Sequence, residues 1–224
     1  MKMDIVTLFP GMFTGVLSNS IIKRAIDKEK VEINLVNFCE YSLDLHGKVD
    51  DTPYGGGNGM VLTCQPIFDC IDALRTKESI VILLTPDGAP YRSEKAYELS
   101  QAKHLILICG HYEGFDERIR SICDQEISIG DYVLTGGEIP AMAIVDSVVR
   151  LLPGVIAEES HLQDSFNDHL LDYPTYTKPS IYRGMKVPDV LLSGDHKKIE
   201  QYRREMRYNR TVERRPDLLK NIEK

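Results

Sequence analysis

The chain has 224 residues, of which 42% are hydrophobic and 27% charged, with a net charge of −7; these values are typical of a globular protein that buries its own core. No apolar run approaches the roughly 20 residues of a membrane-spanning helix, and Met1–Ile5 lacks the pattern of a signal peptide. We therefore expect a cytoplasmic protein without a membrane partner, and a charge of this sign, if evenly spread, argues against a nucleic-acid partner.

The first half of the chain alternates between the patterns of strands and helices. Strands that are apolar on both faces and alternate with helices indicate an α/β fold with a mostly parallel sheet and helices on both faces. The predicted strands are Met3–Phe9, residues 31–35, Ile80–Leu84 (followed by a turn at Pro86, Asp87 and Gly88), Leu105–Cys109 and Tyr132–Thr135. The predicted helices are residues 21–26, Gln65–Arg75, Glu138–Leu152 and a helix that Ser93 caps and that continues to about Gln101.

A different organisation follows Pro153 and Gly154, which are expected to end the last of these helices. Residues 157–164 are polar and without a clear period, which indicates a linker or mobile loop. Further on, a basic helix is predicted, with Asp195 as its N-cap. We predict a first domain at 1–156, a flexible linker at 157–166 and a small helical domain at 167–224.

The charge is not evenly spread along the chain. Residues 178–224 contain 13 Lys and Arg against 7 Asp and Glu, whereas the preceding residues are acidic in sum. This asymmetry suits an acidic protein with one basic face for nucleic-acid phosphates, although a solvated helix of mixed charge has the same composition.

The five cysteines are an odd number and include no C-x-x-C pair. This pattern disfavours a disulfide framework and a zinc site. We expect reduced, mostly buried thiols at Cys39, Cys64, Cys70, Cys109 and Cys123, and no metal site.

Glycine-rich loops follow three of the predicted strand regions, at 85–88, 110–114 and 129–137. Ligands of open α/β sheets bind beyond the carboxyl ends of the strands, so these loops together could hold a small molecule, or they could be plain tight turns. The glycine run at 54–59 matches neither a dinucleotide fingerprint nor a P-loop, which leaves a dehydrogenase unsupported.

Several side chains are candidates for acid–base chemistry. No HExxH motif or Ser-His-Asp order is present, and His111 and His161 stand alone. The candidate acids are Glu113, Asp116, Asp164 and Asp168, with Arg118, Arg120 and Arg150 as possible partners.

Two longer segments, Gly110–Arg118 and Ile129–Glu138, closely resemble the bacterial TrmD-type tRNA (guanine-N1)-methyltransferases of the SPOUT class. The resemblance covers essentially the whole chain with matching order and spacing. Further matching segments are Phe9-Pro10, Val49–Asp51 through Met60, Asp164–Phe166, Tyr173–Pro179 and Arg214–Leu219.

The resemblance implies a deep trefoil knot in the first domain, which is an exception to the rule that folds are unknotted. It also implies that S-adenosylmethionine is held by loops around the knot, and that the protein is a homodimer whose active sites are shared between subunits. The positions that match the family's cofactor-binding residues are Thr85, Pro86, Gly88, Gly110, Tyr112, Glu113, Ile129, Gly130, Tyr132, Leu134, Gly136, Gly137 and Pro140.

The resemblance further implies methyl transfer to N1 of the guanine on the 3′ side of the anticodon, nucleotide 37 of tRNA. Asp164 matches the family's general base and Arg150 the arginine that stabilises charge on guanine O6, while Glu113 helps to orient these groups. Dependence on Mg²⁺ without a visible ligand cluster is also implied. The residues expected to contact the anticodon stem-loop are Ser165, Arg203, Arg207, Arg210, Arg214 and Arg215.

The sequence departs from the family pattern at several positions. His111 stands where the family commonly has Arg, and His46-Gly47-Lys48 replaces a segment that usually contains another arginine; Thr52, Asn58, Asp87 and Ala89 also differ from frequent choices. Two alternatives remain: a knotted methyltransferase with another target, and a non-catalytic RNA-binding module. The Asp164-Ser165 match favours guanine N1 over the first, and the retained loop glycines disfavour the second.

Overall fold

The computed structural model describes residues 1–157, 164–166 and 168–221. The chain divides into two compact units, Met1–Ala157 and Glu158–Lys224. The predicted linker at 157–166 falls largely on residues 158–163, which lie outside the described residues.

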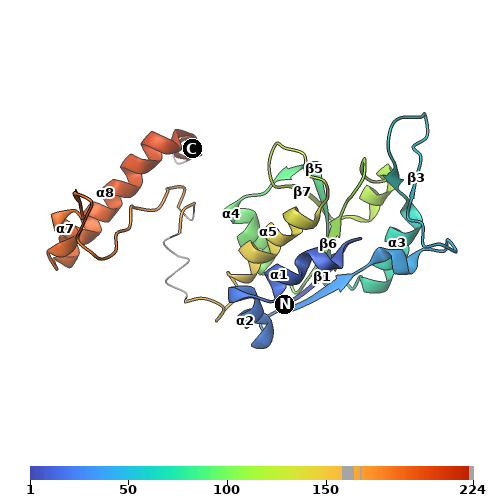
Figure 1. Ribbon diagram of the computed structural model, residues 1–224, viewed down its shortest axis with the longest axis horizontal. Helices are drawn as coiled ribbons and strands as arrows, with labels where there is room; N and C mark the ends of the chain where they lie inside the picture. The colour runs from blue at the N-terminus through green and yellow to red at the C-terminus, as the bar shows by residue number, and fades with distance from the viewer. Residues whose placement is uncertain (158–163, 167, 222–224) are drawn as a thin grey trace. The chain divides into compact units, whose positions relative to one another are not determined.

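A five-stranded parallel sheet forms the centre of the first unit (Figure 1). Its order is β2-β1-β6-β5-β7, so β6 lies between β1 and β5 although it follows both in the sequence. Strand β6 is buried at every residue, as expected for a central strand covered on both faces. The strands are β1 (Lys2–Val6), β2 (Glu32–Val36), β5 (Ser79–Pro90), β6 (His104–Cys109) and β7 (Gln125–Ser128).

Helices cover both faces of this sheet, and successive residues of each strand point to opposite faces. Leu105 and Leu107 of β6 belong to the hydrophobic cluster under α2 (Ser20–Asp27), α4 (Ser93–Ser100) and α5 (Glu138–Val149). Ile106 and Ile108 belong to a second cluster under α3 (Cys64–Leu74). This arrangement confirms the predicted α/β class with a mostly parallel, two-sided sheet. Shorter elements of this unit are η1 (Pro10–Phe13), α1 (Thr14–Leu17), η2 (Phe38–Tyr41), β3 (Asp50–Asp51), β4 (Val61–Leu62) and η3 (Glu117–Ile122).

Three details of the predicted elements were wrong. The segment Tyr132–Thr135 is not a strand, and the edge strand of the sheet is Gln125–Ser128 instead, which the sequence analysis did not predict. Strand β5 does not end in a turn at residues 86–88 but resumes pairing with β7 at Ala89 after an irregularity.

Helix boundaries also differ from the predictions. Ser93 is the first residue of α4, while the N-cap position is taken by Arg92 without a side-chain cap. Helix α5 ends at Val149, three residues earlier than predicted, and Arg150 occupies its C-cap. In contrast, the prediction of Asp195 as a cap is confirmed, because its side chain accepts a hydrogen bond from the N–H of Lys198 over 3.2 Å.

Among the described residues of the second unit, the longest element is helix α8 (His196–Arg214), which has the predicted basic character. Shorter elements of this described part are a hairpin of β8 (Ile181–Tyr182) and β9 (Met185–Lys186), α7 (Asp189–Leu192) and η4 (Pro216–Asn221); the hairpin was not predicted.

A row of polar side chains lies at the amino ends of the central strands. Asp4 is fully buried, and its carboxylate lies 2.9 Å from Nε2 of His104, 2.9 Å from Nζ of Lys2 and 2.9 Å from Nδ2 of Asn34. The other ring nitrogen of His104 lies 2.7 Å from Oγ of Ser79. The sequence analysis did not anticipate this Ser79–His104–Asp4 row, which joins β1, β5 and β6 at the sheet edge away from the glycine-rich loops.

All five cysteines are free, and Cys70 and Cys109 are buried. Among the residues that the structure describes, no helix is both long and apolar enough to cross a membrane.

Candidate active site

A pocket of about 230 Å³ opens at the carboxyl ends of β6 and β7, beside the irregularity inside β5. Its volume far exceeds the ~10–15 Å³ that one water needs, so it can hold a small molecule. Its walls are the three predicted loop regions: residues 84–86 where β5 leaves its register with β7, residues 110–115 after β6, and residues 127–137 at and after β7, with Pro140 on α5.

The structure brings the predicted cofactor-binding residues together. All of them line this pocket except Gly88. A Cβ added at Gly88 would lie 2.5 Å from the backbone nitrogen of Ile127, so this glycine permits close packing of β5 on β7. The sequence analysis missed the strand-end residues Leu84, Ile127 and Ser128, which also line the pocket; a rule that ligands bind at strand ends would include them once β7 is known.

Backbone contacts between the loops define the pocket's shape. The N–H of Gly137 donates a hydrogen bond to the carbonyl of Gly110 over 2.9 Å. A Cβ on Gly137 would lie 2.6 Å from Cα of Cys109, closer than real side chains come to a backbone. Only glycine allows the loop after β7 to lie directly against the end of β6.

The glycine run at 54–59 supports one wall of the pocket. The N–H of Glu113 donates to the carbonyl of Met60 over 3.0 Å, and a Cβ on Gly59 would lie 2.4 Å from Cγ of Glu113. The Glu113 side chain therefore lies against the run whose purpose the sequence left open, and the small size of Gly59 provides its space.

A buried carboxylate lies beneath the loop that carries His111. Glu138 is 1% exposed, and its Oε1 accepts a hydrogen bond from the hydroxyl of the buried Thr7 over 2.8 Å. The same hydroxyl oxygen accepts the N–H of Phe9 over 3.0 Å, and the Phe9 ring packs against the imidazole of His111 at 4.8 Å between centroids. Thr7 and Glu138 were not predicted as site residues, and their polarity in otherwise apolar segments is the signal that marks them.

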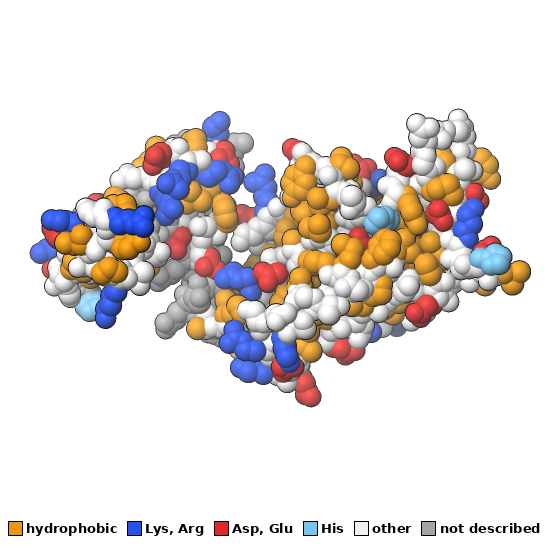
Figure 2. All heavy atoms as spheres, viewed as in Figure 1, with side chains coloured by type: hydrophobic (Ala, Val, Ile, Leu, Met, Phe, Trp, Pro, Cys, Tyr) orange, Lys and Arg blue, Asp and Glu red, His pale blue; other side chains and the backbone are white. Residues whose placement is uncertain are grey.

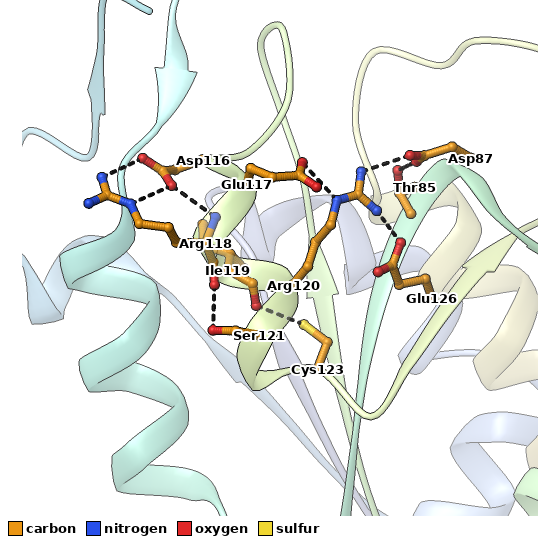
Figure 3. A network of polar contacts seen from close by, with 10 residues as sticks. All are labelled: Thr85, Asp87, Asp116, Glu117, Arg118, Ile119, Arg120, Ser121, Cys123 and Glu126. Atoms are coloured by element: carbon orange, nitrogen blue, oxygen red, sulfur yellow. Dashed lines mark hydrogen bonds and ion pairs between the residues drawn. The ribbon is translucent and has the colours of Figure 1, made fainter. Parts of the chain in front are cut away.

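Several of the acid–base candidates form ion pairs away from the pocket. Asp116 accepts hydrogen bonds from Nε and Nη2 of Arg118 over 2.9 and 2.7 Å, and these bonds hold the pKa of Asp116 far below its ordinary value. Arg120 is surrounded by Asp87, Glu117 and Glu126 (Figure 3). These contacts give Asp116, Arg118 and Arg120 structural functions.

The remaining two catalytic candidates lie in different units. Arg150 is half-buried at the C-cap of α5 in the first unit, where its N–H donates to the carbonyl of Asp146 over 3.3 Å. Asp164 belongs to the second unit, where its neighbour Ser165 accepts the N–H of Asp172 on Oγ over 2.9 Å.

Lys and Arg side chains gather on the visible face of the second unit (Figure 2). Arg203 lies over the ring of Tyr173, 4.8 Å from its centroid, and Arg215 pairs with Asp217 over 2.7 Å. Arg214 is exposed in the last turn of α8 and Arg210 is half-exposed. Arg207, also predicted to contact tRNA, has a side chain that is 18% exposed and is engaged by Asp168.

Together, a parallel α/β sheet, a pocket built from glycine-rich loops at its carboxyl edge and a separate unit with a basic helix are typical of a small-molecule-binding protein that also meets nucleic acid. The sequence profile of the tRNA (guanine-1)-methyltransferase TrmD family matches residues 1–221. The chain therefore belongs to this family.

Individual relatives agree with this assignment. The chain is 58% identical over 227 residues to the tRNA (guanine-N(1)-)-methyltransferase of Shouchella clausii (strain KSM-K16), covering 100% of this chain and 93% of the relative. It is 56% identical over 222 residues to the protein of the same name from Staphylococcus carnosus (strain TM300), covering 98% and 91%. The corresponding Bacillus pumilus (strain SAFR-032) protein is 58% identical over 224 residues, covering 98% and 92%.

Proposed function

We propose that this protein transfers a methyl group from S-adenosylmethionine to N1 of guanine 37, on the 3′ side of the tRNA anticodon, and so forms 1-methylguanosine. The observation that carries the proposal is the convergence of the three glycine-rich loops on one pocket in a chain of this family. The proposal includes a cytoplasmic location and action as a homodimer.

The pocket suits an adenosine-containing ligand. Apolar side chains such as Leu84, Ile129 and Leu134 can cover a purine, and the backbone of the loop 129–137 offers N–H and C=O groups for its edge. S-adenosylmethionine bound there would supply a methyl group on its sulfonium. A nucleophile in line with the S–CH₃ bond would bond to the methyl carbon, and the sulfur would leave as the neutral thioether. Dependence on Mg²⁺ remains part of the proposal; among the described residues no group of three or more His, Cys, Asp or Glu is placed to hold a metal ion.

Guanine N1 carries a proton at neutral pH and becomes a strong nucleophile only as that proton leaves. The proposal therefore gives Asp164 the task of accepting the N1 proton. Negative charge then grows on guanine O6, where the Arg150 guanidinium stabilises it. Glu113, which lines the pocket, helps to orient these two side chains.

The proposal combines Asp164 of one copy with the pocket and Arg150 of a second copy. With such a shared site, each catalytic centre requires residues of both subunits, so the protein would be active only as a dimer.

The tRNA must present its target outside a base-paired helix, because N1 is blocked by pairing. The arginines on and just after α8 would hold the phosphates of the anticodon stem-loop. Arg203, Arg214 and Arg215 are exposed and Arg210 is half-exposed, while Arg207 would serve beside its ion pair with Asp168.

We also infer that the chain forms the trefoil knot. The inference is supported by the hydrogen bond between Gly137 and Gly110, because the chain that leaves edge strand β7 crosses β5 to reach the end of β6.

The test is methyl transfer from labelled S-adenosylmethionine to an unmodified tRNA transcript, with nucleoside analysis of the product. We expect 1-methylguanosine, lost when guanine 37 is changed to adenine. Asp164→Asn should lower kcat by about 10²–10⁴-fold with unchanged cofactor binding, whereas Asp189→Asn, a matched change at an exposed position of the same unit, should not. Methylation of another nucleotide would refute guanine 37 as the target. A normal rate for Asp164→Asn would refute Asp164 as the general base.

Mixed dimers test the shared site. Asp164→Asn and Arg150→Ala subunits are each expected to be inactive alone, and mixing them should restore activity to one of the two sites of a mixed dimer. No recovery after proven subunit exchange would contradict the shared arrangement.

A further inference from the structure

We propose that Arg120 is a positioning residue for the cofactor pocket: it holds the loop 85–88 against strand β7 and thereby sets the affinity for the methyl donor. The inference rests on the proposed function, in that the ligand of the pocket is taken to be S-adenosylmethionine. Arg120 does not line the pocket and acts through Asp87 and Thr85.

The loop in question interrupts a β-ladder. Strands β5 and β7 pair from Ile82 to Leu84, and the register then shifts, so that pairing resumes only at Ala89. Residues 85–88 leave the ladder at the point where Thr85 and Pro86 line the pocket. A segment that is out of register with its neighbouring strand relies on other contacts to keep one conformation.

Arg120 supplies these contacts from the neighbouring η3 helix. Its Nη2 lies 2.8 Å from Oδ2 of Asp87 on the loop, and its Nη1 binds the carboxylate of Glu126 on β7 (Figure 3). The other carboxylate oxygen of Asp87 accepts the hydroxyl of Thr85. A continuous chain of charge-assisted hydrogen bonds thus runs from the ladder strand β7 through Arg120 and Asp87 to the pocket wall.

The geometry requires an arginine. Two carboxylates from different segments bind different nitrogens of one guanidinium, a fork that the single ammonium of lysine cannot reproduce. The Arg120 side chain is 26% exposed and that of Glu126 33%, so the central contact is partly shielded from water, whereas Glu117, which binds Nε over 3.0 Å, is 83% exposed. Without Arg120, Asp87 and Glu126 would repel each other and drive the loop away from β7.

The experiment compares Arg120→Met, Arg120→Lys, Asp87→Asn and the control Glu117→Gln. S-adenosylmethionine binding is measured by calorimetry, and amide hydrogen exchange of Thr85, Asp87 and Gly88 is measured without ligand. We expect Arg120→Met to weaken binding roughly tenfold or more and to speed exchange in the loop. Arg120→Lys should recover part of both effects. Asp87→Asn, at a position 64% exposed and outside the core, should reproduce the affinity loss with an unchanged melting temperature, and Glu117→Gln should bind and exchange as wild type.

Wild-type affinity and loop exchange in both Arg120→Met and Asp87→Asn would overturn the proposal. If Arg120→Met unfolds, Asp87→Asn decides, because it cuts the same chain at an exposed position. If the wild-type protein itself fails to bind S-adenosylmethionine, the proposed function fails, and the exchange measurement still decides whether Arg120 holds the loop. Steady-state kinetics give a further check, since a positioning effect on this pocket raises KM for the methyl donor and leaves KM for tRNA unchanged.

Discussion

Arg207 and Asp168 form a two-point ion pair, with Nη1 and Nη2 of the arginine 2.7 and 2.5 Å from the two carboxylate oxygens. Arg207 also donates through Nε to the carbonyl of Leu171 over 3.3 Å. The guanidinium thereby ties α8 to the segment that follows Asp164 and Ser165. A residue predicted to contact tRNA thus also fixes the structure next to the proposed general base.

Replacing Asp168 with Asn should lower the free energy of unfolding of the second unit by about 1 kcal/mol, because the pair is partly shielded but one partner is half-exposed. Arg207→Lys should cost a similar amount. The control is Arg204→Lys, whose exposed pair with Glu200 should change stability by less than about 0.5 kcal/mol.

The ion pair also predicts a pH dependence. Partial burial alone raises the pKa of Asp168, but Arg207 holds this pKa below its ordinary value. The stabilisation by the ion pair should therefore be present at neutral pH and lost as the pH falls below 3.8. Denaturant unfolding at several pH values measures both effects, and equal loss from Arg204→Lys would contradict the assignment.

Gly137→Ala should abolish binding of S-adenosylmethionine. The new methyl group would meet the backbone of Cys109 and Gly110, which cannot move aside as a flexible side chain can. The matched control is Gly15→Ala in α1, where nothing lies within 4 Å of the added atom. Calorimetric titration and circular dichroism distinguish a damaged pocket from a lost fold. Wild-type affinity in Gly137→Ala would show that the two loops are less closely packed than described.

Alkylation should distinguish native from unfolded cysteines. Burial, followed by the charges of Asp4 and Glu40, raises the pKa of Cys70 to about 12. At pH 8 this thiol should react with iodoacetamide roughly a thousandfold more slowly than an unfolded thiol of pKa 9.0, since only the thiolate reacts. The folded state holds the thiol proton of Cys70 more tightly than the unfolded state does. The stabilisation of the folded state by this protonated thiol is therefore complete below pH 9.0 and is lost as the pH rises from 9.0 toward 12. Mass spectrometry of labelled peptides with and without urea tests the rate; rapid native labelling of Cys70 at pH 8 would contradict it.

Asp4→Ala should destabilise the first unit by about 3 kcal/mol or more, because three donors would lose the one carboxylate on which they converge. Asp27→Ala offers a comparison, since Asp27 is 54% exposed and pairs only along its own helix with Lys23, so its loss should cost less than about 0.5 kcal/mol. Urea unfolding followed by circular dichroism measures both variants. A small effect of Asp4→Ala would mean that water replaces the carboxylate.

The elements that the sequence predicted well are those with strong hydrophobic patterns. The strand Leu105–Cys109 follows from a short run that is apolar at every position, and the helix Gln65–Arg75 follows from apolar residues at a period of 3.6. Strand β7 escaped prediction because Ile127 is its only aliphatic residue, and its identity depends on pairing with β5. Tyr132–Thr135 has the composition of a strand, yet Tyr132 and Val133 are 55% and 86% exposed beside the pocket, so its apolar residues do not signal burial in a sheet.

The pocket loops were predictable because parallel strands bring their carboxyl ends to one edge. The polar contacts were not, because they join residues far apart in the sequence: Thr7 with Glu138, or Ser79 with His104 and Asp4. Arg120 and Arg207 show the same limit. Their charge is visible in the sequence, whereas the carboxylates that engage them are fixed only by the tertiary fold.

The position of β6 between β1 and β5 has a consequence for synthesis on the ribosome. β1 can pair with β2 early, but its other edge stays open until residue 109 has emerged, and the pocket lacks a wall until residue 137 follows. Such long-range pairing is slow and leaves a strand edge exposed in the meantime. A nascent chain that ends before residue 109 therefore leaves the edge of β1 unpaired, and one that ends before residue 137 lacks a complete pocket.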